Sequence, residues 1–255
     1  MPAAERVPEL TLPTADALRL LRDGSIEIVG RLTEASNATL YCEVRPSGKA
    51  PAEDEAVEHA VYKPIRGERP LDDFPHGTLA FREVAAFEVS EALGWGIVPP
   101  TTMRDDLPLG PGMVQLWIDV DETADVLEMI LTRDVRLRRM ALFDAIVNNA
   151  DRKGGHVLPR DDGHLYGCDH GICFSAEPKL RTVLWGWRGE PLTAEESSCV
   201  VHIDAALASD LGVRLRGLLS AREVAAMHRR VAKLIADGAM PKPDPYRPAI
   251  PWPPF

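Results

Sequence analysis

The sequence predicts an α+β protein of two lobes, with a strand-rich first lobe and a mostly helical second lobe. Two observations predict this fold class. Residues 25–118 contain short segments in which apolar and polar side chains alternate, as in strands that bury one face. After Asp121 the apolar residues instead recur at helical spacing. We therefore expect three regions, which are an N-lobe over residues 1–118, a helical C-lobe over 119–240 and a proline-rich tail over 241–255.

The first lobe is predicted to form an antiparallel sheet with one main helix. Its strands are the alternating segments, which cover residues 25–32, 39–44, 59–64, 97–103 and 112–118. A short amphipathic helix over 13–23 precedes them and ends at Gly24. The clearest helix of the chain covers 79–93. Gly94 marks its end, because glycine readily adopts the left-handed conformation that terminates helices.

The second lobe is predicted to hold helices around a short hairpin over residues 156–168. The helices are expected over residues 123–131, 134–149, 193–198, 202–208 and 213–236. The tail from Pro241 to Phe255 contains too many prolines to be helical. Two alternatives stay open for it, an extended strap packed on the protein or a disordered segment.

The composition excludes several classes of protein. The 255 residues are 45% hydrophobic, which is enough to bury a substantial core. A net charge of −10 argues against a general nucleic-acid binder, which normally carries a basic surface. A basic cluster is the local exception, formed by Arg133, Arg136, Arg138 and Arg139. We interpret this cluster as a solvated helix face, with contact to an anionic substrate or a membrane as the alternative.

Three sequence features predict the cellular location and the redox state of the cysteines. They are the absence of a membrane-spanning run, of a signal peptide and of paired cysteine motifs. No apolar run reaches the length of about 18 residues needed to cross a bilayer. The first residues also lack the apolar core of a signal peptide, so we expect a cytoplasmic protein without a membrane partner. The four cysteines show no CxxC spacing. This predicts reduced thiols, with neither a zinc ribbon nor a disulfide framework.

Four charged residues in a fixed order suggest a phosphoryl-transfer centre. Such a centre needs positioning and concentrated positive charge more than covalent chemistry. On its strand, Lys63 would place a cation against phosphates, and Glu83 on the following helix would hold that cation in place. Asp151 lies on a loop after a helix, where it would orient a hydroxyl or accept its proton. Asp169, in Asp169-His170-Gly171, would bind a metal ion at a turn that the glycine permits.

The motifs around these residues resemble the atypical kinases that include the phosphatidylinositol 3-/4-kinases, especially the type II 4-kinases, and the bacterial HipA-type Ser/Thr kinases. The resemblance runs from about residue 30 to residue 174 and lies in the order of the segments. Its segments are Val61-Tyr62-Lys63-Pro64, Arg82-Glu83-Val84-Ala85-Ala86-Phe87, Leu93–Thr101, Gly112–Ile118 and Asn148-x-x-Asp151-Arg152. The joint match is specific for the superfamily and says little about the substrate.

The resemblance implies a protein-kinase-like fold that uses ATP with Mg²⁺ or Mn²⁺. It implies catalytic roles for Lys63 and Asp151 and metal binding by Asp169 and His156. It further implies nucleotide contacts from Lys63, Glu83, Thr33, Ser36, Gln115 and Trp117. The partners expected are ATP and an acceptor hydroxyl on a protein or a small molecule.

The chain also departs from the family pattern. His156 stands where the family has asparagine, and a neutral imidazole suits Mn²⁺ or Zn²⁺ better than Mg²⁺. Lys153 replaces the histidine of the Asp-Arg-His motif. The turn expected over the phosphates, residues 33–38, has no glycine, so contact would come from its backbone amides or from the hydroxyls of Thr33 and Ser36.

Two further features have competing interpretations. His164 follows an Asp-Gly turn, and strand alternation predicts that it faces solvent rather than a metal. Trp185 and Trp187 follow Asp169 where an activation segment would lie. We expect them to pack in the core or between the lobes, and a substrate platform or a membrane-facing pair is the alternative.

These observations lead to one principal hypothesis and two alternatives. The principal one is an ATP-dependent phosphotransferase acting on a hydroxyl. A pseudokinase would bind nucleotide without turnover, and a nucleotidyl transferase would release pyrophosphate instead of ADP.

Overall fold

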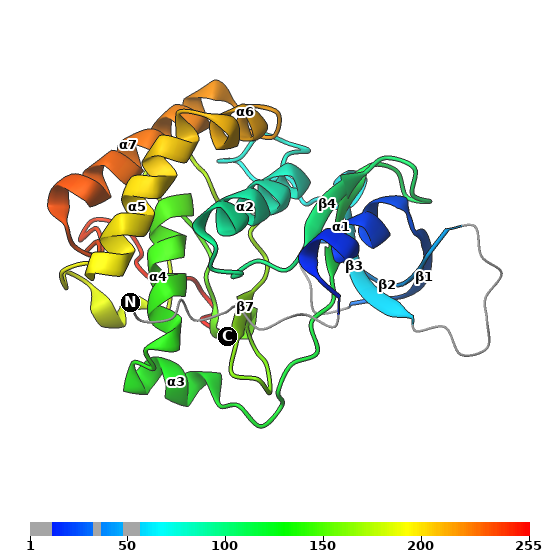
Figure 1. The fold of residues 1–255 in the computed structure, drawn as a ribbon, viewed down its shortest axis with the longest axis horizontal. Coiled ribbons are helices and arrows are strands. Elements are labelled where there is room, and N and C mark those ends of the chain that lie inside the picture. The colour runs from blue at the N-terminus through cyan, green and yellow to red at the C-terminus, as the bar shows by residue number, and fades with distance from the viewer. Residues whose placement is uncertain (1–11, 33–36, 48–56) are drawn as a thin grey trace.

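The computed structural model describes residues 12–32, 37–47 and 57–255, which form two lobes (Figure 1). The first lobe is built on a five-stranded sheet, and the second consists mainly of helices. The α+β fold class predicted from the sequence is therefore confirmed. The predicted phosphate-contacting hydroxyls of Thr33 and Ser36 lie outside the described residues.

The sheet of the first lobe is antiparallel, with strand order β1-β2-β3-β5-β4. The strands are β1 (Ser25–Arg31), β2 (Leu40–Arg45), β3 (Glu58–Pro64), β4 (Thr101–Arg104) and β5 (Gly112–Leu116). The predicted start of the fourth strand at residue 97 is wrong, because Pro99 and Pro100 have no N–H to contribute to a ladder. Lys63 lies near the end of the central strand, opposite Met113 of β5.

Helices cover the two faces of this sheet. On one face, α1 (Thr14–Asp23) buries Ala17 and Leu21 against a cluster that includes Tyr62 of β3. Side chains alternate between the two faces of a strand, so Lys63 points to the opposite face from Tyr62. The second helix, α2 (Leu79–Leu93), packs on β4 and β5 there and also contacts the helices of the other lobe. It is buried on nearly all sides, as its largely apolar sequence requires.

The second lobe contains five α-helices and a two-stranded hairpin among its described residues. They are α3 (Val126–Thr132), α4 (Arg136–Val147), β6 (Val157–Pro159), β7 (Leu165–Gly167), α5 (Ala194–Leu207), α6 (Asp210–Arg216) and α7 (Ala221–Asp237). The separate helices predicted over 193–198 and 202–208 are one helix, α5. No glycine or proline interrupts it, and its buried Val200 and Ile203 continue a single apolar stripe.

The prediction of one long helix over 213–236 is also wrong, because this region contains two helices, α6 and α7. Helix α6 ends at Gly217. The side chain of Ser220 then accepts the backbone N–H of Glu223, while the Glu223 carboxylate accepts the backbone N–H of Ser220. This reciprocal capping box begins a new helix.

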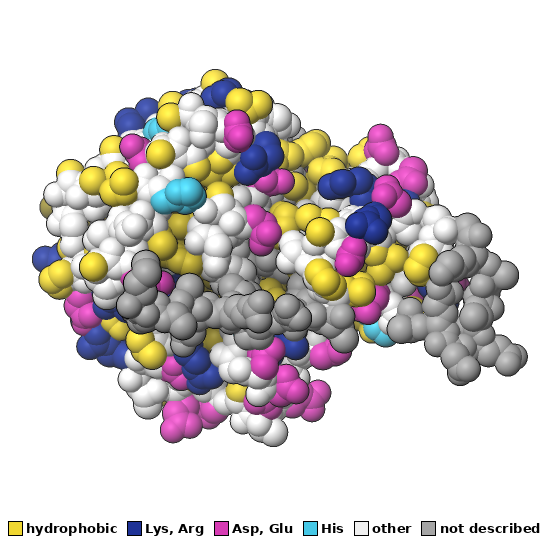
Figure 2. Space-filling model, viewed as in Figure 1, with side chains coloured by type: hydrophobic (Ala, Val, Ile, Leu, Met, Phe, Trp, Pro, Cys, Tyr) yellow, Lys and Arg dark blue, Asp and Glu magenta, His cyan; other side chains and the backbone are white. Residues whose placement is uncertain are grey.

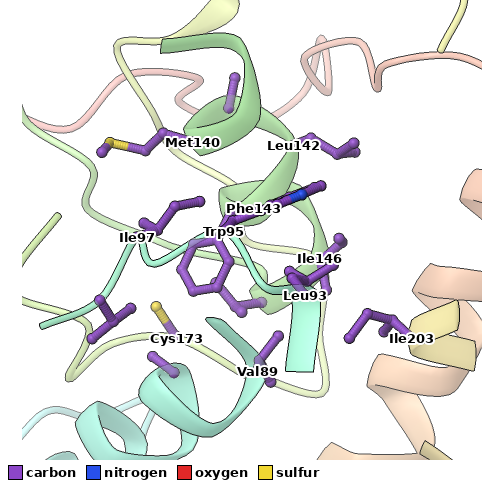
Figure 3. Close-up of a cluster of buried hydrophobic side chains, with 14 of the residues drawn as sticks. Val89, Leu93, Trp95, Ile97, Met140, Leu142, Phe143, Ile146, Cys173 and Ile203 are labelled. Atoms are coloured by element: carbon purple, nitrogen blue, oxygen red, sulfur yellow. The ribbon is translucent and has the colours of Figure 1, made fainter. Parts of the chain in front are cut away.

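The main hydrophobic core lies where α2 meets the second lobe. Figure 3 shows side chains from α2, α4 and α5 converging on Trp95, Ile97 and Cys173. Because α2 carries Glu83 and α4 leads into the loop that holds Asp151, this core fixes the two parts of the candidate site relative to each other. Trp187 is also buried in it, as predicted, whereas Trp185 is half-buried and is not part of this core.

The proline-rich tail is an extended strap, which was one of the two alternatives predicted for it. Arg247 donates to the carbonyl of Pro178 at 2.6 Å. The carbonyl of Ala249 accepts both the backbone N–H of Thr182 at 3.0 Å and the indole N–H of Trp185 at 2.8 Å. The strap brings Phe255 against Gly154, on the loop after α4.

The surface shows acidic and basic side chains interspersed on the face seen in Figure 2. Each arginine of the basic cluster has a carboxylate partner, and these pairs are Arg133–Glu190, Arg136–Asp134, Arg138–Glu196 and Arg139–Glu195. The prediction that His164 faces solvent is wrong, because its ring Nε2 donates to the carbonyl of Gly96 at 2.9 Å. All four cysteines are free. Among the described residues, no helix is long and apolar enough to cross a membrane.

Candidate active site

The centre of the candidate site is the ammonium group of Lys63. Its Nζ lies 2.6 Å from Oε1 of Glu83 and 2.9 Å from Oδ1 of Asp169. The three residues come from β3, from α2 and from the loop after β7, so this one cation joins the two lobes. Burial alone would lower the pKa of Lys63, but the charges of Asp169 and Glu83 outweigh it and hold the pKa above its usual range.

Glu83 is buried, with 2% of its side chain exposed. Its second carboxylate oxygen accepts the backbone N–H of His170 at 2.8 Å. Burial raises the pKa of Glu83, and the opposing charge of Lys63 limits that rise. Glu83 thus fixes the lysine with one oxygen and the Asp169-His170-Gly171 turn with the other.

Asp169 occupies an unusual backbone position. Its φ angle is +59°, in the left-handed region that residues other than glycine enter rarely and at some cost. The charge of Lys63 keeps the pKa of Asp169 below its usual range, so the carboxylate is ionised. Because Oδ1 contacts the lysine, Oδ2 is the oxygen directed toward His156, whose Nε2 is 3.5 Å away.

His156 lies beside Asp169 and is neutral at physiological pH. Burial lowers its pKa to about 4, despite the nearby Asp169 charge. Its Nδ1 accepts the backbone N–H of Lys153 over a long 3.5 Å contact. In this tautomer the ring proton is on Nε2. Coordination through Nε2 would therefore require the proton to move to Nδ1, at the loss of that weak hydrogen bond.

Asp151 lies on the loop after α4. Its backbone N–H donates to the side chain of Asn149 at 2.9 Å, and its carboxylate is 3.4 Å from Nζ of Lys153. Burial raises the pKa of Asp151, and Lys153 partly offsets this effect. Lys153 therefore provides the nearest positive charge to the candidate base.

The other predicted nucleotide contacts lie on the sheet. Gln115 of β5 is opposite Val61 of β3 and so shares the face of Lys63, two positions along that strand. Its side chain is buried and donates to Oγ1 of Thr101 at 2.8 Å. Trp117 follows β5, and its ring meets the edge of Tyr41 with centroids 4.9 Å apart. Tyr41 also stacks on His59 at 5.2 Å. An aromatic cluster of Tyr41, His59 and Trp117 thus lies toward the other end of β3.

Sequence reasoning missed an ion pair beside the Asp151 loop. Arg152 and Asp144 are both fully buried, with Nη2 and Oδ1 3.0 Å apart. The same carboxylate accepts from Asn149 at 3.0 Å and from Thr182 at 3.2 Å. Arg152 also donates to the carbonyl of Cys168 at 3.1 Å and lies 2.6 Å from Nε2 of His170. This network ties α4, the Asp151 loop and the Asp169 turn into one unit.

A signal for this network was present in the sequence. Asp144 interrupts the apolar run of α4, and a carboxylate inside such a run needs a buried partner. Asn148 also stabilises the surroundings of the site. Its side-chain amide donates to the carbonyls of Ser175 and Glu177 at 2.9 and 2.8 Å. It thereby fixes the segment that follows Asp169.

The structure brings together Lys63, Glu83, Asp169 and His156, with Asp151 on the adjoining loop. Gln115 and Trp117 lie farther along the sheet. Among the described residues, no group of three or more histidine, cysteine, aspartate or glutamate side chains is arranged to hold a metal ion. Any ion at Asp169 and His156 would therefore need further ligands from a substrate or from water.

Comparison with known proteins supports the kinase resemblance. The chain is 41% identical to protein Rv2133c of Mycobacterium tuberculosis, over 94% of this chain and 96% of that protein. It is 25% identical to phosphatidylinositol 4-kinase gamma 4 of rice, over 57% of this chain but only 33% of the plant protein. No model of a protein family matches.

A solved structure gives the same result for the fold. The crystal structure of the Helicobacter pylori proinflammatory kinase CtkA aligns with a TM-score of 0.50 at 11% identity, covering 86% of this chain and 94% of that one. The likeness shows that the fold is that of a kinase. Together with the distant similarity to the plant enzyme, it bears out the kinase resemblance predicted from the sequence motifs.

Proposed function

This chain belongs to one family with protein Rv2133c, and from its kinase fold and the Lys63–Glu83–Asp169 constellation we propose that it is an ATP-dependent phosphotransferase. Its reaction would move the γ-phosphoryl group of ATP to a hydroxyl of a protein or a small molecule. The observation that carries the proposal is the half-buried Lys63 cation, held by two carboxylates from different lobes. Phosphoryl transfer needs such a cation, fixed in position, against the phosphates.

Lys63 would bind the phosphates of the nucleotide, and Glu83 would hold the ammonium group of Lys63 in one position. Glu83 is suited to this role because it is buried and is also anchored to the His170 backbone. The base and ribose would lie along the same face of the sheet, toward Gln115 and the Tyr41–Trp117 cluster. Aromatic rings there would offer a stacking surface for adenine.

Asp151 would orient the acceptor hydroxyl and take its proton as the phosphoryl group leaves ATP. Burial raises the pKa of Asp151 above that of a free aspartate, and this higher pKa makes the carboxylate a better proton acceptor. Lys153, 3.4 Å away, would stabilise negative charge on the acceptor side.

The donor set fits a divalent cation in part. Oδ2 of Asp169 is a suitable oxygen ligand, and His156 fits only with its proton on Nδ1. A bound Mg²⁺ or Mn²⁺ would neutralise charge on the phosphates. Mg²⁺ in nucleotide sites is commonly held by one or two carboxylates and the phosphates themselves, which agrees with the few protein ligands here.

The test is chromatography of nucleotide products after the protein is incubated with ATP and either Mg²⁺ or Mn²⁺. We expect ADP, and we expect it to be lost in Asp151→Ala. AMP with pyrophosphate would instead identify a nucleotidyl transferase. Absence of turnover together with measurable ATP binding would identify a pseudokinase. That alternative is favoured by the sequence at this position, because His156 stands where the family pattern has asparagine.

A further inference from the structure

A large cavity, mainly in the second lobe, has neither Lys63 nor Asp169 among its lining residues. Its volume is about 670 Å³, which is within the range of small-molecule sites. Its walls are the end of α4, one side of α7, the segment 176–185 and the beginning of the proline-rich strap. Three of these walls are far apart in the sequence, so only the folded strap completes the cavity.

The charge of this cavity is opposite to that of the whole protein. Seven basic and three acidic side chains line it, whereas the chain carries a net charge of −10. Each of the three acids already has a basic partner in the wall. These pairs are Asp73–Lys179, Asp237–Lys233 and Asp244–Arg247. The other four cations, which are Arg181, Arg229, Arg230 and Lys242, form no ion pair with a carboxylate among the described residues, although the charge of Arg181 also acts on Asp73 and Asp151.

Arg230 is the most informative of these four. Its Nε and Nη1 donate to the carbonyls of Ile146 and Ser175, each at 3.2 Å. Its Nη2 is buried and has no hydrogen-bond partner within the described part of the chain. Burial lowers the pKa of Arg230 to about 10, as expected for a guanidinium without a counter-charge. A buried donor of this kind costs stability unless something else satisfies it.

The rest of the wall is apolar. Ala145, Leu180, Trp185, Leu234 and Pro241 supply much of it. Trp185 is held in place by its indole N–H, which donates to Ala249 of the strap. Ligand sites typically combine an apolar lining with a few convergent polar groups, and this cavity has both.

We propose that this cavity is a second ligand site, which binds a small molecule carrying a phosphate monoester on an apolar body. A phosphate supplies up to two negative charges and three acceptor oxygens, which match several unpaired cations better than one carboxylate does. The apolar body would contact the Leu180–Trp185 wall. This site is separate from the proposed nucleotide cleft and does not depend on the protein being a kinase.

The experiment is isothermal titration of the full chain with phenyl phosphate, inorganic phosphate, benzoate and phenol as probes. We expect phenyl phosphate to bind most tightly. Equal affinity for inorganic phosphate would overturn the apolar part of the proposal. Equal affinity for benzoate or phenol would overturn the phosphate part, and no binding of phenyl phosphate would overturn the site itself.

Variants locate the binding. Arg230→Lys keeps the charge but removes the planar guanidinium, and we expect roughly tenfold weaker binding of phenyl phosphate, the scale of one charge-assisted hydrogen bond. Arg229→Gln with Lys242→Gln should weaken binding by a similar factor. Neither side chain has a hydrogen bond or ion pair among the described residues, so this variant should fold. The matched control is Arg216→Gln, an exposed charge on α6, which should leave the affinity unchanged.

A last variant separates this site from the nucleotide cleft. Lys63→Ala should leave phenyl phosphate binding intact, even if it abolishes ATP binding. Loss of the probe in Lys63→Ala, or unchanged affinity in both cavity variants, would show that the probe binds elsewhere and would overturn the proposal. If the protein turns out not to transfer phosphoryl groups, these affinities still decide the question.

Discussion

Nζ of Lys63 and Oδ1 of Asp169 are 2.9 Å apart, although 106 positions separate the two residues in the chain. The contact joins the sheet of the first lobe to the turn that follows the hairpin of the second. Asp169 makes it from a left-handed backbone conformation, which surrounding structure must hold in place. That structure is visible, because Glu83 contacts both the lysine and the backbone of His170.

The lysine and its partner should be essential for nucleotide-dependent transfer. We expect Lys63→Met to reduce the transfer rate by about 10² or more, because a fixed cation against the developing phosphate charge is lost. Glu83→Gln should also reduce it, since the lysine keeps only Asp169. The measurement is ATP turnover. The control is Glu88→Gln, which removes a carboxylate from the same helix that instead pairs with Arg214. Equal losses in Glu83→Gln and Glu88→Gln would contradict the assignment.

His156 should influence which metal the protein prefers. We expect His156→Asn to strengthen ATP binding with Mg²⁺ relative to Mn²⁺, because an amide oxygen is a harder ligand than an imidazole nitrogen. The measurement is the ratio of ATP affinities in the two metals. His164→Asn is the control, since its ring contacts the Gly96 carbonyl in the hairpin region instead. A ratio unchanged by His156→Asn would remove His156 from the metal site.

The same histidine should make stability depend on pH. In the folded protein its pKa is about 4, below the ordinary value near 6.5. Between these two values the unfolded chain binds a proton that the folded protein does not, so stability falls as the pH falls through this window. One such group contributes a slope of up to about 1.4 kcal/mol per pH unit.

The comparison that isolates this effect is wild type against His156→Asn from pH 6.5 to pH 5, by urea unfolding. The variant should lose less stability over that interval. Parallel curves would mean that His156 titrates normally in the folded protein, and an NMR titration of its ring protons would then show a midpoint near 6.5.

The buried pair Asp144–Arg152 should be the most sensitive element beneath the site. Asp144→Asn leaves the fully buried guanidinium without its counter-charge, and we expect a loss of about 3–5 kcal/mol in the free energy of unfolding. Asp134→Asn removes a surface partner of Arg136 and should cost less than about 1 kcal/mol. Denaturant unfolding of both variants decides the point, and equal costs would show that the buried pair is not coupled to the fold.

Residue patterns predicted the first lobe well, because its strands and helix ends are set by residues close together in the sequence. Alternation placed the five strands, and Gly94 placed the end of α2. The largest boundary error in this lobe, the start of β4, follows from Pro99 and Pro100, and β5 also ends two residues earlier than predicted. The predicted helix boundaries failed in the second lobe, where the choice between one helix and two depends on which face is buried. The capping pair Ser220–Glu223 was a local signal for the start of α7 that the apolar periodicity concealed.

The order of the motifs in the sequence predicted the charged residues of the candidate site. It did not predict the buried residues that hold them in place. Periodicity cannot tell that Arg152 is buried or that it reaches both Asp144 and His170. Those contacts depend on how α4, the loop and the turn meet in three dimensions. For the same reason the sequence left open whether the tail packs, since extended proline-rich segments form few contacts within themselves.

The strap should hold the loop that carries Asp151 and His156. The backbone N–H of Gly154 donates to the carbonyl of Pro254 at 2.8 Å, and the ring of Phe255 packs directly on Gly154. A Cβ added at Gly154 would lie 1.9 Å from a ring carbon of Phe255, so the ring would have to move. We therefore expect Gly154→Ala to destabilise the protein by about 1–3 kcal/mol and to lower transfer activity.

Phe255→Ala should remove most of that cost, because the clash is with its ring. A double-mutant cycle on the free energy of unfolding measures this coupling, which we expect to exceed about 0.5 kcal/mol. Gly155→Ala is the matched control, since nothing lies within 4 Å of a Cβ at that position. If Gly154→Ala lowers the free energy of unfolding equally with and without the Phe255 ring, the strap does not stabilise the loop. Any loss of activity then arises from the loop backbone alone.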